Sequence, residues 1–140
     1  MNEIVVPIGD EPAARAAAEQ AVAQYRQEPG LVHLVNVQRP LPRHVAQFFP
    51  GGELNGHYRD TGMHVLAPAV RVLDEAGVPH REHVLVGKPA EAIVQFAREH
   101  GSNRVLLDNE PQSALALLGL GSLGSQVRHL MGSVATKTAA

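Results

Sequence analysis

The chain has 140 residues, 44% of them apolar and 19% charged, which is the size and composition of one ordinary domain. It contains no cysteine, so disulfides, thiolate metal sites and cysteine nucleophiles are excluded. The net charge of −2 and the lack of tryptophan and of basic runs argue against a nucleic-acid surface. The first residues lead directly into a short apolar run, so we expect no signal peptide, no membrane span and a cytoplasmic location.

Short apolar runs bounded by Gly, Pro, Asn or Asp predict buried parallel strands. These runs cover residues 4–8, 31–37, 84–86 and 105–107. Apolar residues at helical spacing between the runs predict amphipathic helices. The helices are expected over residues 11–28, about 60–76 and 89–100.

The helix boundaries have chemical signals. Asp10 is a candidate N-cap of the first helix, and Gly77 and Gly101 follow the other two. Pro68 either kinks the second helix or starts its regular half. Strands that alternate with helices predict an α/β fold, an open and doubly wound parallel sheet with right-handed crossovers.

Two segments do not show the spacing of apolar residues that is typical of a helix or a strand. Residues 38–57 hold Pro and Gly residues with Phe48 and Phe49 side by side, so we expect a long loop whose Phe pair folds back onto the body or onto a partner. Towards the C-terminus, an apolar stretch at 114–118 and a Gly-rich stretch at 119–124 precede a short helix expected over 127–134.

The chain resembles the universal stress protein family. The matching segments follow one another in order over residues 1 to about 107, with a short one near the end: EIVVPIGDEPAARAAAEQAV, LVHLVNVQRPLP, LAPAVRVLDEAGVPHREHVLVGKPAEAIVQFAREHG and GSVATK. The resemblance implies one domain over residues 1–140 with a Rossmann-like, adenine nucleotide alpha hydrolase-like fold and the strand order 3-2-1-4-5. It also implies ATP or AMP binding at the carboxyl ends of strands 1 and 4.

The nucleotide site that the resemblance implies combines these strand ends with a C-terminal glycine motif. Its candidate residues are Pro7, Ile8, Gly9, Asp10, Val37, Leu107, Asp108, Gly119, Gly132, Ser133 and Val134.

The first departure from the family concerns an aspartate. Relatives that bind ATP usually carry Asp directly after the Val-Pro-x of strand 1, on the adenine and ribose side. Here Gly9 occupies that position and Asp10 comes one residue later. Asp10 therefore has two interpretations, a ribose contact or an N-cap of the following helix.

The second departure concerns the phosphates. Gly119, Ser122, Gly132 and Ser133 keep the spacing of the family motif, but the motif stands away from strand 4, where Asp108 adds a negative charge. Two like charges about 4 Å apart cost roughly 4 kcal/mol at an effective dielectric of about 20. Asp108 thus argues against a triphosphate unless Mg2+ offsets the charge, and we expect weak or no ATP binding.

The third departure concerns the sheet edge. After Val134 only a short polar tail remains, so we expect strand 5 to be missing and the sheet to have the order 3-2-1-4. An uncovered strand 4 would be an exposed apolar edge. We therefore expect it to be covered by residues 109–118, by the C-terminal segment or by a second chain, and we expect a homodimer.

Simpler interpretations stand beside the functional ones. The glycine cluster at 119–124 is either a phosphate cradle or a set of turns, and Pro7 and Val37 end buried strands whether or not they contact adenine. Lys88 either attracts a phosphate or is simply solvated. His80 and His83 enter a strand three positions apart and should point to opposite faces, so no metal site is expected, and His33 reads as a satisfied core or edge imidazole.

The sequence therefore predicts a universal stress protein-like module that acts in stress adaptation through binding. A second hypothesis is nucleotide-independent dimerisation or docking to an unknown protein partner. A third is a hydrolase or transferase of the related fold, but no nucleophile elbow, Walker A motif or H-E-x-x-H motif is present, so we do not expect an enzyme.

Overall fold

Strands and helices alternate along the chain as the apolar pattern predicts. The computed structural model describes residues 2–102, 104–108 and 136–139. The strands in these ranges are β1 (Asn2–Pro7), β2 (Gly30–Gln38), β3 (His80–Val86), β4 (Arg104–Asp108) and β5 (Thr136–Ala139). The helices are α1 (Glu11–Gln27), α2 (Arg43–Ala46), α3 (Glu53–Ala76) and α4 (Pro89–Glu99).

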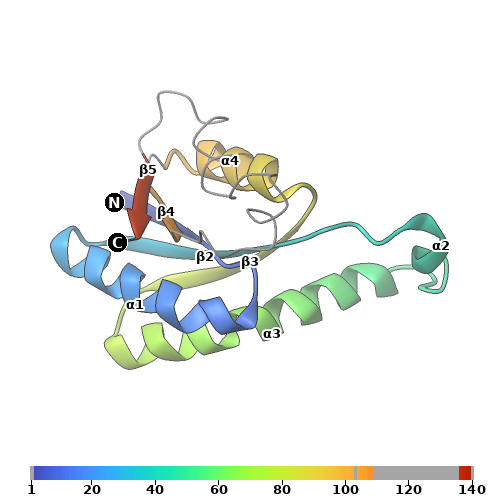
Figure 1. Cartoon of the computed structure of the whole chain (residues 1–140), viewed down its shortest axis with the longest axis horizontal. Coiled ribbons are helices and arrows are strands. Elements are labelled where there is room, and N and C mark those ends of the chain that lie inside the picture. Colours follow the sequence, from blue (N-terminus) through green and yellow to red (C-terminus); the bar gives the residue numbers. More distant parts are fainter. Residues whose placement is uncertain (1, 103, 109–135, 140) are drawn as a thin grey trace, which may run out of the picture.

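The strands form one parallel sheet in the order β3-β2-β1-β4-β5 (Figure 1). Within it, Val5 of β1 lies opposite His33 of β2 on one side and Val105 of β4 on the other. The predicted α/β class and the order 3-2-1-4 are confirmed.

The sheet is covered on both faces (Figure 1). Helices α1 and α3 pack on one face, where Ile4 and Val6 lie in a buried cluster with Leu66. Helix α4 covers the other face, where Val5 lies in a second cluster with Ile93. Alternate side chains of β1 thus enter separate cores, which explains why this strand is apolar throughout.

The expectation that strand 5 is missing is wrong. Residues Thr136–Ala139 form β5, which pairs in parallel with β4 and covers its edge. The sequence pattern missed this strand because a short edge strand needs only backbone hydrogen bonds, and its residues Thr-Lys-Thr-Ala show no apolar run.

The expectation of a long irregular loop over residues 38–57 is also wrong in part. The segment contains α2, and α3 begins at Glu53, seven residues before the predicted start, so that Pro68 lies inside the helix. No side-chain cap marks this start, because Gly52 is the N-cap residue. The hydroxyl of Tyr58 instead accepts a hydrogen bond of 2.8 Å from the backbone of Leu41, which ties the preceding chain to the helix.

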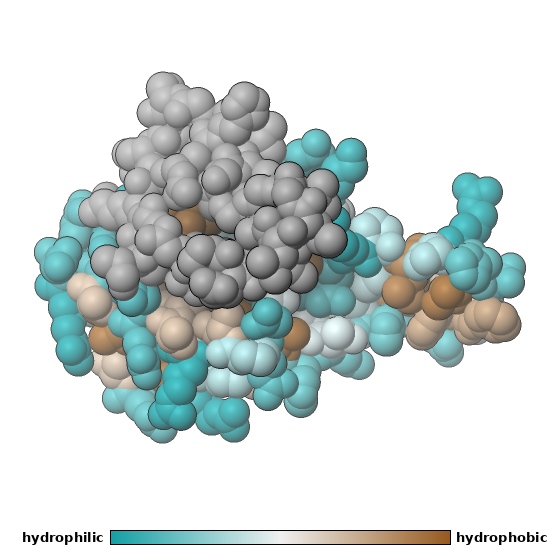
Figure 2. Space-filling model, viewed as in Figure 1, coloured by the Kyte–Doolittle hydropathy of each residue, from teal (hydrophilic) through white to brown (hydrophobic). Residues whose placement is uncertain are grey.

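Residues 39–59, which we call the arm, extend beyond the sheet (Figure 1). Helix α3 has 24 residues and β3 has 7, which correspond to about 36 Å and about 23 Å. Phe49 packs on the His57 ring at 4.9 Å between centroids, whereas Phe48 is 75% exposed. Apolar surface is visible on the arm in Figure 2. Phe49 therefore packs within the arm, and neither phenylalanine is shown to fold onto the body of the domain as expected.

Other helix boundaries agree with the sequence. Gly77 ends α3 with a φ of 69°, and Gly101 follows α4 with a φ of 63°. No helix in the described ranges is long and apolar enough to cross a membrane. The features expected over 114–118, 119–124 and 127–134 lie outside the described residues.

Candidate functional site

The order in which the chain adds strands to the sheet changes side between β1 and β4. From β1 the chain passes through α1 to β2 on one side, and from β3 it passes through α4 to β4 on the other. The strand order therefore reverses at β1 and β4, which makes their carboxyl ends a topological switch point. In open α/β sheets, ligands bind in the crevice formed at such a switch point.

A buried amide fixes the segment that leaves β1. The Ile8 N–H donates to the Val35 carbonyl at 2.8 Å, and the Asn36 side chain donates to the Ile8 carbonyl at 2.9 Å. Gln38 in turn donates to the Asn36 side-chain oxygen at 2.6 Å. Asn36 was not among the predicted site residues; its signal in the sequence is one amide within the apolar run of β2.

The exit from β1 leaves space at Gly9. The residue is exposed, and a Cβ atom placed there would have no atom of the described residues within 4 Å. Its φ is not positive, so the backbone also tolerates a side chain. A larger residue therefore fits at the position where the family usually has aspartate.

Asp10 caps α1. Its Oδ1 accepts a hydrogen bond of 3.0 Å from the backbone N–H of Ala13, while its own backbone is extended. The N-cap interpretation is therefore confirmed. The same carboxylate lies at the mouth of the switch point, next to Gly9.

The other strand-end candidates are mostly covered. Pro7 and Val37 are half-buried, and Val37 packs against the core beneath α4. Leu107 is buried in the same core, and Asp108 is the last residue of β4. The structure thus brings these residues to one edge of the sheet, whereas Gly119, Gly132, Ser133 and Val134 lie outside the described residues.

Acidic groups are frequent at this edge. Glu11 stands in the first turn of α1 directly after Asp10, and its Oε2 lies 3.2 Å from Nε2 of the exposed His64 of α3. Asp108, the last residue of β4, is a third acidic residue in the sequence of these strand ends. Two exposed cations also follow carboxyl ends of strands: Arg39 comes directly after β2, and Lys88, the N-cap residue of α4, follows β3.

The histidines lie on both sides of the sheet. His80 contacts Asp74 of α3 at 3.3 Å, whereas His83 contacts His33 at 2.9 Å on the α4 side, so the predicted opposite directions are confirmed. His33 is buried with a partner on each ring nitrogen, as expected for a satisfied imidazole. Within the described ranges, no group of three or more His, Asp or Glu residues is arranged to hold a metal ion.

A cavity lies apart from this edge, against the outer strand β3. Its volume is about 360 Å³, and it lies between α3 and β3. The lining residues are Asn55, Tyr58, Arg59, Met63, Glu82, Val84 and Val86. None of the predicted site residues is among them.

Comparisons with known proteins agree with this architecture. Residues 1–139 match the model of the universal stress protein family. No curated protein matches the chain. Fold similarity extends over nearly the whole chain in several solved structures, at low sequence identity.

Three of these structures illustrate the similarity. The universal stress protein UspA from Lactobacillus plantarum is 16% identical with a TM-score of 0.73, over 99% of this chain and 97% of that one. A universal stress protein from Archaeoglobus fulgidus in complex with dAMP is 20% identical with a TM-score of 0.68, over 99% and 97%. A family protein from Arabidopsis thaliana with AMP bound is 14% identical with a TM-score of 0.64, over 99% and 90%.

Proposed function

The chain belongs to the universal stress protein family, and on this premise we propose that it binds adenine nucleotides weakly at the carboxyl ends of β1 and β4 and acts in stress adaptation. The observation that carries the proposal is the switch point between these strands, where the described part of the chain places no atom against an added Cβ at Gly9. Fold relatives from Archaeoglobus fulgidus and Arabidopsis thaliana hold dAMP and AMP.

The local charges favour a nucleotide with few phosphates. Asp10, Glu11 and Asp108 stand at the strand ends where a nucleotide would bind. Each phosphate added to the ligand increases the repulsion from these carboxylates, by roughly 4 kcal/mol for a charge pair about 4 Å apart at a dielectric of about 20. We therefore propose AMP as the better ligand and ATP as the poorer one, with Mg2+ required only to offset the charge of a bound triphosphate.

We propose a binding role for the protein rather than a catalytic one, in the cytoplasm. The fixed exit from β1, held by Asn36, supports a preformed contact surface for a nucleobase. A nucleotide that binds weakly leaves the protein responsive to changes in nucleotide concentration, since occupancy changes most when the concentration is near Kd.

The experiment is a titration of the labelled protein with AMP, followed by backbone amide chemical shifts. The amides expected to move are those at 8–11, 37–38 and 107–108. Amides at the opposite ends of the strands, such as those of Leu31 and Arg81, serve as the internal control. Shifts centred on the cavity between α3 and β3 would contradict the proposed site.

A second candidate function is self-association or docking to a protein partner. The specific observation is Phe48, which is 75% exposed on the arm, because an aromatic ring this exposed is a common anchor of interfaces. We propose a homodimer in which the arm or the segment 125–135 makes the contact.

Light scattering at high concentration tests this candidate. A dimer should weigh twice the 15.0 kDa of one chain. Phe48→Ser should weaken association through the arm, and Leu130→Glu should weaken association through the C-terminal segment. A wild-type monomer at every concentration would exclude the candidate.

A further inference from the structure

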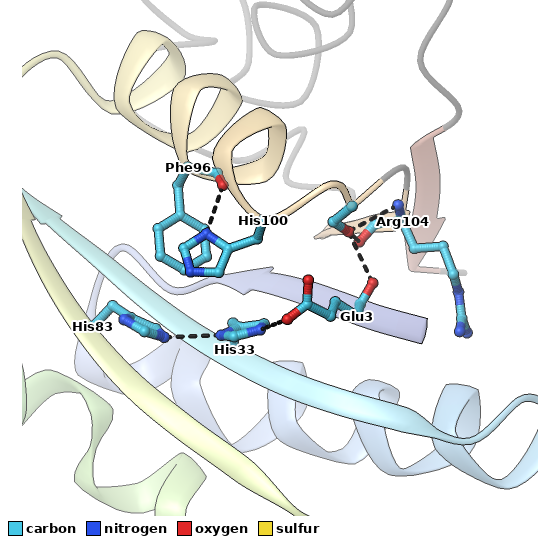
Figure 3. Close-up of polar contacts among 7 residues, drawn as sticks. Glu3, His33, His83, Phe96, His100 and Arg104 are labelled. Carbon is cyan, nitrogen blue, oxygen red and sulfur yellow. Dashed lines mark hydrogen bonds and ion pairs between the residues drawn. The ribbon is translucent and has the colours of Figure 1, made fainter. Parts of the chain in front are cut away.

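A cluster of titratable side chains lies between the sheet and α4 (Figure 3). It consists of Glu3 from β1, His33 from β2, His83 from β3 and His100 directly after α4, gathered around the ring of Phe96. We call these five residues the histidine cluster. Glu3 and Gly9 stand at opposite ends of β1, so the cluster is separate from the candidate nucleotide site.

The cluster contains a continuous chain of hydrogen bonds. His33 Nε2 lies 3.0 Å from Glu3 Oε1, and His33 Nδ1 lies 2.9 Å from His83 Nε2. With both rings neutral and Glu3 ionised, the bonds assign the protons: His33 donates to Glu3, and His83 donates to His33. The His33 side chain is 2% exposed, so water cannot reach its ring nitrogens, and the loss of either partner would cost free energy.

Phe96 and His100 connect this chain to α4. The Phe96 ring stacks on His100 at 4.0 Å between centroids and lies 4.6 Å from His83 and 5.4 Å from His33. His100 Nδ1 also donates to the Phe96 carbonyl at 2.9 Å. The end of α4, with Phe96 and His100, therefore rests on the two imidazole rings of the sheet, those of His33 and His83.

A positive charge on His83 is unfavourable within the histidine cluster. Burial, and after it the positive charges of His33, His100 and Arg81, together lower the pKa of His83 from 6.5 to about 4. Glu3 is the carboxylate that faces the cluster, and it is already bonded to His33.

The hydrogen-bond chain can accept one added proton but not two. With one proton added to the pair His33 and His83, one ring still donates and the other still accepts between them, and Glu3 balances the charge. With two protons added, both rings present N–H groups to each other across 2.9 Å. The bond is then lost, and two positive charges face each other beneath Phe96.

We propose that Glu3, His33, His83 and His100 form a pH-sensitive switch that holds the end of α4 against the sheet at neutral pH and releases it in acid. The element that responds is the last turn of α4, since its Phe96 and the following His100 contact the sheet through the imidazoles. Arg81 of the outer strand adds a fixed positive charge that favours release.

The direction of the pH effect follows from linkage. In the unfolded chain His83 takes up its proton around pH 6.5, whereas in the folded chain it does so only near pH 4. Below pH 6.5 the unfolded state thus binds more protons than the folded state. The contribution of His83 to stability is complete above pH 6.5 and is lost progressively as the pH falls towards 4.

The first test is a pH titration of the wild-type protein by NMR of the imidazole groups, with amide hydrogen exchange recorded in parallel. We expect His83 to titrate near pH 4. We also expect the protection of α4 amides, corrected for the intrinsic exchange rate, to fall at least about tenfold more than that of α1 amides between pH 6.5 and 4. A His83 midpoint near 6.5, or equal losses of protection in both helices, would overturn the proposal.

The second test compares two histidine variants. His83→Gln keeps a donor for His33 but cannot titrate, and His44→Gln removes an exposed histidine on α2 as the matched control. Between pH 6.5 and 4 the unfolding equilibrium constant should rise about tenfold less in His83→Gln than in the wild type, while His44→Gln should follow the wild type. If all three proteins lose stability in parallel, the histidine cluster is not the switch.

Discussion

Close packing at Gly62 shows how much one residue contributes to the contact between α3 and the sheet. Gly62 is buried, and a Cβ atom placed there would lie 2.6 Å from both γ-methyl groups of Val84 and 3.0 Å from Oδ1 of Asn36. A valine side chain is stiff at χ1, so its methyl groups cannot move aside without strain. The absence of a side chain at Gly62 therefore lets α3 approach β3 and the amide that fixes β1.

We predict that Gly62→Ala destabilises the protein. Overpacking costs about 1–3 kcal/mol, and the better helix propensity of alanine returns about 1 kcal/mol or less, so the net loss should be about 1–2 kcal/mol. The matched control is Gly56→Ala in the same helix, because Gly56 is exposed and no atom in the described part of the chain lies within 4 Å of a Cβ added there.

Urea denaturation of both variants and the wild type measures this difference. The control should gain up to about 1 kcal/mol. Equal stabilisation of both variants would mean that Val84 and Asn36 adjust freely and that Gly62 has no packing role.

For single residues, the sequence predicted which face of the sheet a side chain points to better than it predicted which side chains contact each other. Alternation placed His80 and His83 on opposite faces, as the structure confirms. The partnership of His33 with His83 was not predictable, because it depends on the register that places Val35 opposite His83. A one-residue shift in register would have turned His83 to the other face.

At the scale of whole elements, α1 positions the candidate site. It starts directly after Asp10, whose carboxylate accepts the Ala13 N–H, and Pro12 lies in its first turn. Both features fix the first turn, where backbone N–H groups lack partners within the helix. The position of Asp10 is thus explained by its role as the N-cap residue of α1.

We predict that Asp10→Ala lowers the free energy of unfolding by about 1 kcal/mol, because one backbone N–H loses its partner. Asp10→Asn should lower it by less than half as much, since asparagine caps about as well as aspartate. Thermal or urea unfolding of the two variants measures the difference. If the two substitutions cost the same, the capping bond contributes nothing and the charge alone matters.

The elements that the sequence missed share a physical cause. Helix α3 begins at Glu53 without a capping side chain, and its first turns hold Gly56 and polar residues, so the 3.6-residue period only appears further along. Strand β5 has no apolar run because it lies at an edge. Both are stabilised by contacts distant in sequence: the bond from Leu41 to Tyr58 and the ladder with β4.

On the scale of the whole molecule, the two ends of β1 contribute to two different proposed sites. Its carboxyl end leads to Gly9 and Asp10 at the candidate nucleotide site, and its amino end carries Glu3 of the histidine cluster. Helix α4 spans both regions, because it begins after Lys88 at the carboxyl edge and ends at Glu99, directly before His100. The doubly wound sheet was predictable from the alternation of strands and helices. Of the candidate nucleotide site, only the residues at the ends of the strands were predictable from the sequence.

The most direct test of the proposed nucleotide site is isothermal titration calorimetry of AMP with the wild type and with Gly9→Asp. Among the described residues nothing lies within 4 Å of a Cβ atom placed at Gly9, and the substitution restores the aspartate that the family resemblance implies on the adenine and ribose side. We predict a wild-type Kd for AMP of about 100 μM or weaker, and binding about tenfold tighter in Gly9→Asp, as expected for one added hydrogen bond to a charged group. Micromolar binding of ATP by the wild type, or no gain in Gly9→Asp, would contradict the account.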